Sequence, residues 1–146
     1  MEKQQSNTEA QNLKAWVVFS AQADMPWLKI LKPGFRHCSV ILNDGKNWIG
    51  FDPLSNYTDI SVHHVPVDFN LPLWMRDRGH TVISASLERP GKPAPWGLLT
   101  CVEAVKRVLG IHKRFILTPW QLYRHLSRRQ NINLFQTSKG EYAWEV

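Results

Sequence analysis

The sequence is poor in cysteine, with only Cys38 and Cys101 among its 146 residues. Two cysteines at this spacing provide neither a disulfide framework nor a cysteine-ligated metal site, so we expect two reduced thiols. His63 and His64 are adjacent, and on a strand they would point to opposite faces, so they do not form a zinc site. We therefore expect no bound metal and no cofactor.

Long apolar runs are also absent, and none approaches the ~20 residues that cross a bilayer. The polar N-terminus, MEKQQSNTEAQNLK, contains no signal-peptide core. We therefore expect a protein without a transmembrane segment that acts in the cytoplasm or within a virion. Acidic residues are outnumbered, 12 against 18 Lys and Arg, and the net charge of +6 favours anionic partners such as nucleic acid, wall polymer or a membrane surface.

Length and a hydrophobic content of 43% suit a single domain with its own core. We expect a flexible N-terminal lead over residues 1–13 and one domain over residues 14–146. Its fold class is predicted to be α+β, a mostly antiparallel sheet of about five strands with the cysteine-bearing helix packed on it. The expected extended segments are Ala15–Ser20, a hairpin within Arg36–Asp52, Asp59–Pro66, His80–Leu87 and an edge strand at Asn133–Gln136.

The clearest helix is LLTCVEAVKRVL, Leu98–Leu109, whose apolar residues recur at helical spacing before Gly110. Thr100 and Glu103 have the spacing of a capping box, which makes Cys101 the first residue of the helix. A second helix is expected from about Pro119 to Arg129, where Thr-Pro again provides a helix start.

The hairpin in Arg36–Asp52 contains Asp44–Gly45, a dipeptide typical of a two-residue type I′ turn. Such a loop pairs Asn43 with Lys46 and sets the register of both strands.

In that register His37 lies directly opposite Asp52, on the same face of the sheet, so the imidazole has a carboxylate beside it. A three-residue loop would put Phe51 or Pro53 opposite His37 instead. The other face takes Cys38 into the core as an inert thiol. The face that suits a site is mixed in polarity and consists of His37, Ser39, Ile41, Trp48, Gly50 and Asp52.

Cys101 is the candidate nucleophile. The positive end of the helix dipole and a nearby imidazolium both favour the thiolate, which is the reactive form. The backbone N–H of Cys101 would be free to donate to an oxyanion on the attacked carbonyl. Taken alone, Cys101 could equally be a small buried helix residue.

The chain contains, in order, a histidine, an acid and a cysteine at the start of a helix. This order resembles the circularly permuted branch of the NlpC/P60 papain-like superfamily. That branch includes lecithin:retinol-acyltransferase-like, YaeF/YiiX-like and PPPDE-type proteins. The resemblance covers roughly Trp16 to Leu126 and is carried by GFRHCSVIL, WIGFDP and TCVEAVKRVLG. It implies a papain-like fold in which Cys101 is the nucleophile, His37 the base and Asp52 the orienting group.

The same resemblance implies a thiol hydrolase, a cysteine peptidase or amidase, with acyl transfer as a related possibility. Its substrates would be peptides, peptidoglycan-like material or other acyl compounds. Ser20 and Gln22 are the candidates for an oxyanion-binding side chain. The small, basic chain would suit a phage or prophage protein.

Two other readings stay open. The chain could be an inactive structural or binding module of the same fold, for example a virion component that contacts wall polymer. It could also bind nucleic acid through a basic cluster on its second helix. That cluster consists of Arg124, His125, Arg128 and Arg129, and the tryptophans that could line a substrate groove are Trp27, Trp48, Trp96 and Trp120.

Overall fold

The computed structural model describes residues 13–22, 26–89 and 91–141, and side chains as far as Asn133. Most of the expected N-terminal lead therefore lies outside the described residues. The elements in chain order are β1 (Lys14–Ser20), the 3₁₀ helix η1 (Pro26–Ile30), β2 (His37–Asn43), β3 (Trp48–Pro53), β4 (Thr58–His63), α2 (Leu71–Asp77), β5 (Thr81–Ala85), α3 (Cys101–Leu109) and α4 (Pro119–Glu141).

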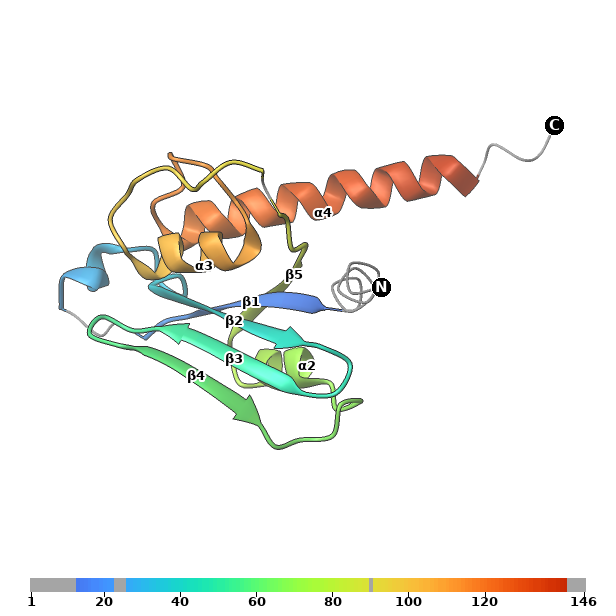
Figure 1. The fold of residues 1–146 in the computed structure, drawn as a ribbon, viewed down its shortest axis with the longest axis horizontal. Coiled ribbons are helices and arrows are strands. Elements are labelled where there is room, and N and C mark those ends of the chain that lie inside the picture. Colours follow the sequence, from blue (N-terminus) through green and yellow to red (C-terminus); the bar gives the residue numbers. More distant parts are fainter. Residues whose placement is uncertain (1–12, 23–25, 90, 142–146) are drawn as a thin grey trace, which may run out of the picture.

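The five strands form one antiparallel sheet in the order β4-β3-β2-β1-β5. Helices α3 and α4 lie against one face of the sheet and α2 lies against the other (Figure 1). The predicted α+β class, with an antiparallel sheet and a cysteine-bearing helix packed on it, is confirmed at this level.

The larger core fills the space between the sheet and α3 and α4. Strand β1 is apolar on both faces because it lies inside the sheet, so Val17 and Phe19 point into this core while Val18 points into the smaller one under α2. The other buried members of the larger core are Ala15, Cys38, Val40, Ile83, Val102, Val105, Leu109, Ile111, Leu122 and Leu126.

The hairpin turn differs from the prediction. Strand β2 ends at Asn43 and β3 begins at Trp48, which leaves a four-residue loop. Among the described residues only glycines have positive φ, so Asp44 does not adopt a type I′ turn. Its carboxylate instead accepts the backbone N–H groups of Lys46 and Asn47 at 2.8 and 2.6 Å, an Asx-type arrangement that stabilises the longer loop.

The strand register is therefore shifted by two residues. Val40 pairs with Phe51, whereas the predicted two-residue loop would pair it with Ile49. Packing stabilises the observed register, because Trp48 is buried and its ring centroid lies 5.2 Å from that of Trp16. A shift of two residues keeps every side chain on its predicted face.

Two further expectations are corrected. The segment predicted as an edge strand, Asn133–Gln136, belongs to α4, which continues past Arg129 to Glu141. No proline follows Pro119 in this segment, so the backbone hydrogen bonds of the helix can continue.

Among the described residues, no helix has both the length and the apolar composition needed to cross a membrane.

A buried lysine ties α3 to the loop that follows it. The Nζ atom of Lys106 donates to Glu103 Oε2 at 2.6 Å and to the carbonyl oxygen of Ile116 at 3.2 Å. We expect Lys106→Met to lower the free energy of unfolding by about 2–3 kcal/mol, because it deprives a partly buried carboxylate and a carbonyl of their donor. Urea denaturation of this variant beside Arg107→Met measures the difference.

Arg107 is the matched control, because it also pairs with Glu103 but its side chain is 43% exposed. An exposed pair contributes about 0–1 kcal/mol. Equal losses of stability in the two variants would contradict the structural role of Lys106.

Candidate active site

The start of α3 agrees with the predicted cap, whereas Leu98 and Leu99, which the predicted helix Leu98–Leu109 included, precede the helix and are exposed. Thr100 is the N-cap, and its side chain accepts the backbone N–H of Glu103 at 3.2 Å. The reciprocal half of the capping box is replaced, since the Glu103 carboxylate binds Lys106 and Arg107 instead. Gly110 ends the helix at φ 74°. Cys101 is thus the first helical residue, where its backbone N–H has no partner within the helix.

His37 and Asp52 are in direct contact. Continuing the observed register brings Asp52 opposite Ser39, so Asp52 lies diagonal to His37 on the same face. The Nε2 atom of His37 lies 2.5 Å from Oδ1 of Asp52. The predicted pair therefore forms, although through a diagonal contact and not the directly opposed one.

The third member, Cys101, lies close enough to the His37 side chain, at the end of the sheet, for each group to shift the pKa of the other. By alternation His37 belongs to the α2 side of the sheet, and it reaches Cys101 because it is the first residue of β2. Since Nε2 is engaged by Asp52, Nδ1 is the ring nitrogen left for the thiol. The structure thus joins all three predicted site residues in the order Cys101, His37, Asp52.

The electrostatics favour a thiolate–imidazolium pair. Burial by itself would lower the pKa of His37, but hydrogen bonds with Asp52 and Cys101 outweigh it and raise the pKa from 6.5 to about 10. The pKa of Cys101 falls from 9.0 to about 5, chiefly through a hydrogen bond from the Cys38 side chain. Burial opposes that fall, and the hydrogen bond with His37 adds to it.

Cys38 is the residue whose contribution the sequence prediction missed. It is fully buried, and burial raises its own pKa well above 9.0, as expected for an inert core thiol. Because it keeps its proton, its S–H and its backbone N–H can both donate to the Cys101 sulfur, which lowers the pKa of Cys101. The signal was present in the sequence, since Cys38 is adjacent to His37, but only packing shows that α3 rests on this residue.

Of the face predicted to hold the site, only the end with His37 and Asp52 belongs to it. Ile41 and Trp48 are buried in the smaller core beneath α2. Ser20, one of the two candidate oxyanion donors, pairs with His37 across β1 and β2. Its buried hydroxyl has no hydrogen-bond partner among the described residues, whereas Gln22 is exposed.

The four tryptophans suggested for a substrate groove do not share one environment. Trp48 lies in the smaller core, while Trp120 stacks on Tyr123 and lies beneath the ammonium of Lys32. Trp27 and Trp96 are both exposed.

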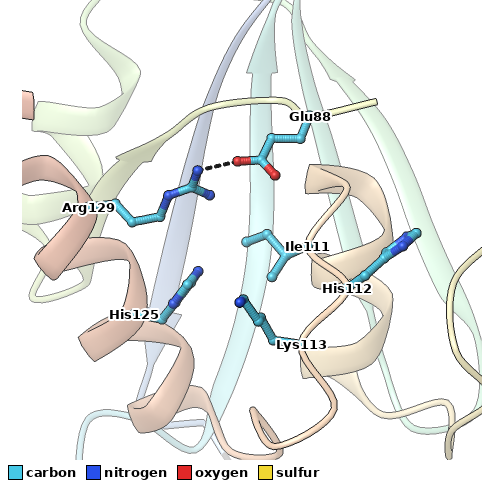
Figure 2. A pocket seen from close by; sticks show the side chains of 6 residues that line it. All are labelled: Glu88, Ile111, His112, Lys113, His125 and Arg129. Carbon is cyan, nitrogen blue, oxygen red and sulfur yellow. Dashed lines mark ion pairs between the residues drawn. The ribbon is translucent and has the colours of Figure 1, made fainter. Parts of the chain in front are cut away.

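A separate cavity lies at the other end of α3, beside α4 (Figure 2). It is lined by Glu88, Ile111, His112, Lys113, His125 and Arg129. Figure 2 shows Arg129 paired with Glu88, so part of the basic cluster suggested for nucleic acid is already neutralised. Burial and the nearby cations Arg129 and Lys113 lower the pKa of His125.

Within the described part of the chain, no group of three or more histidine, cysteine or acidic side chains is arranged to hold a metal ion. Comparison of the chain with models of protein families, with curated proteins and with solved structures found no match.

Proposed function

We propose that this protein is a papain-like thiol hydrolase that acts on amide or ester carbonyls. The observation that carries the proposal is the chain of contacts from Cys101 to His37 and from His37 to Asp52. An inert structural cysteine needs no such chain, and its thiol would not have a pKa of about 5. The resemblance to the permuted NlpC/P60 proteins, in the order of the three residues and in the segments that carry them, supports the same function.

In the first step the Cys101 thiolate attacks the substrate carbonyl carbon, and the carbonyl electrons move onto the oxygen. The free backbone N–H of Cys101 is suited to donate to this oxyanion. Ser20 is the candidate for a second donor, because its hydroxyl lies beside His37 and has no other partner among the described residues.

In the second step the bond to the leaving group breaks, and that group takes the proton from Nδ1 of His37, leaving an acyl thioester on Cys101. Water then gives its proton to His37 and attacks the thioester, which releases the acid and restores the thiolate–imidazolium pair. Asp52 acts as a positioning residue, since its contact with Nε2 holds the ring with Nδ1 toward the sulfur.

Peptides, peptidoglycan fragments and other acyl compounds all present a carbonyl that this chemistry could attack, in a cytoplasmic or virion setting. If an amine or alcohol replaces water in the last step, the same residues perform acyl transfer. The alternative function is binding without catalysis, performed by a module of the same fold.

The test is to trap the acyl-enzyme. The protein is incubated with p-nitrophenyl esters, peptides and muropeptides, quenched in acid and analysed by mass spectrometry. We expect an adduct of the acyl mass on the peptide that contains Cys101, and we expect added glycinamide to accelerate its loss if acyl transfer competes with hydrolysis. Absence of an adduct with every compound, or an adduct that forms equally well in His37→Ala, would contradict the proposal.

A further inference from the structure

Five large apolar side chains are strongly exposed on the two segments that flank α3. Trp96 and Phe115 are each 89% exposed, and the others are 68–78% exposed. The set, called the apolar patch below, consists of Trp96, Leu98, Leu99, Phe115 and Leu117. Side chains of this kind in solvent mark a surface that meets another apolar phase or molecule.

The two segments lie next to one another. A Cβ added at Gly97 would lie 3.7 Å from the Glu103 carboxyl carbon. That carboxylate binds Lys106, and Lys106 binds the carbonyl oxygen of Ile116. Figure 1 shows both segments on the side of α3 that faces away from the sheet. The chain of contacts from Gly97 to Ile116 therefore brings the two halves of the apolar patch together.

The charge around the apolar patch has one sign. Residues 91–99 and 111–118 contain Lys92, Lys113 and Arg114 and no acidic residue. The two carboxylates beside these segments are already paired, Glu103 with Lys106 and Arg107, and Glu88 with Arg129. An apolar surface with an excess of cations beside it is complementary to a surface that is anionic at its boundary and apolar within.

We propose that the apolar patch docks on an anionic lipid bilayer. Tryptophan, phenylalanine and leucine side chains enter the boundary between headgroups and acyl chains, while nearby lysine and arginine bind anionic headgroups. A binding protein would need a groove shaped to these loops, whereas a fluid bilayer accepts projecting side chains of any arrangement. The docking requires no transmembrane helix and does not depend on the proposed thiol chemistry.

The apolar patch lies beside the end of α3 that carries Cys101. Trp96, Leu98 and Leu99 immediately precede the Thr100 cap, so they lie at the end of α3 that carries Cys101. A docked molecule would therefore hold the Cys101 end of α3 close to the lipid surface.

The test is co-sedimentation of the full chain with vesicles of phosphatidylcholine that contain phosphatidylglycerol. The variant Trp96→Ser, Leu98→Ser, Phe115→Ser should bind these vesicles about tenfold or more weakly, which corresponds to losing the insertion of three large side chains. Circular dichroism and the rate of Cys101 alkylation check that the variant is folded.

The matched control carries three similar changes on the outer strand of the sheet, Tyr57→Ser, Ile60→Ser and Val62→Ser. Ile60 and Val62 lie on β4 and Tyr57 directly precedes it, at the edge of the sheet, and the three are 50–69% exposed. The control should bind vesicles like the original chain, and binding should weaken with added salt.

Four results would overturn the proposal. The first is no sedimentation with anionic vesicles, and the second is an equal loss of binding in the two triple variants. The third is a concentration-dependent dimer in sedimentation velocity that the apolar-patch variant abolishes, without vesicle binding, because the patch would then be a self-association surface. Equal binding to pure phosphatidylcholine contradicts the role of the cations.

Discussion

Replacing Cys101 with alanine should lower turnover by at least about 10⁴-fold, because loss of a covalent nucleophile removes the whole acyl-enzyme route. The substrate is whichever compound in the trapping experiment acylates the protein fastest, and the rate is measured under saturating conditions. The fold should survive, since Cys101 is the first residue of α3 and is partly exposed.

The control for this prediction is Cys38→Ser. It removes the other thiol but keeps a hydroxyl that can donate to the Cys101 sulfur, so most of the activity should remain. Turnover that persists in Cys101→Ala with matching substrate dependence would show that Cys101 is not the nucleophile.

The alkylation of Cys101 by iodoacetamide should be fast from about pH 5 upward, because its thiolate forms at a pKa of about 5. Below that pH the sulfur is protonated and the rate falls. In His37→Ala the imidazolium is lost, the pKa of Cys101 rises toward the free-thiol value of ~8.5, and the rate at pH 6.5 drops about 10- to 100-fold. Mass spectrometry of the Cys101 peptide measures the rate at each pH.

Five variants separate the contributions of Cys38 and Asp52 to the reactivity of Cys101. Cys38→Ala removes the S–H donor and should also raise the pKa of Cys101, whereas Cys38→Ser should leave it low. Asp52→Asn keeps an oxygen that can accept from His37 and should change the profile less than Asp52→Ala. Asp59→Asn is the charge control, because Asp59 pairs with Asp52 across β3 and β4. A profile indifferent to both His37 and Cys38 would contradict the thiolate–imidazolium pair.

Local features of the sequence predicted the cysteine-bearing helix well. Thr100 as the N-cap, Cys101 as the first helical residue and Gly110 as the stop all follow from interactions within a few residues. The hairpin turn shows the limit of such reasoning, since Asp44–Gly45 suits a two-residue loop in isolation. His37 and Asp52 still share a face because the observed register differs from the predicted one by two residues. A difference of one residue would have placed the two side chains on opposite faces of the sheet.

The extension of α4 past Arg129 could not be predicted from local features of the sequence either. Gln130 in α4 donates through Nε2 to the backbone carbonyl of Ser84 at 3.0 Å. This contact joins residues 46 positions apart and lies just past Arg129, where the helix was predicted to end. Long-range contacts of this kind leave no periodic signal in the sequence, so the continuation of the helix was not predicted.

The sequence by itself determined the antiparallel α+β class, the start of α3 and the placement of His37 and Asp52 on one face of the sheet, because each depends on polarity patterns and on near neighbours in the chain. Only the tertiary structure decided the register, through the packing of Trp48 on Trp16. It also decided that Cys38 supports the Cys101 thiolate and that two loops present one apolar patch, because those contacts form only when α3 lies on the sheet.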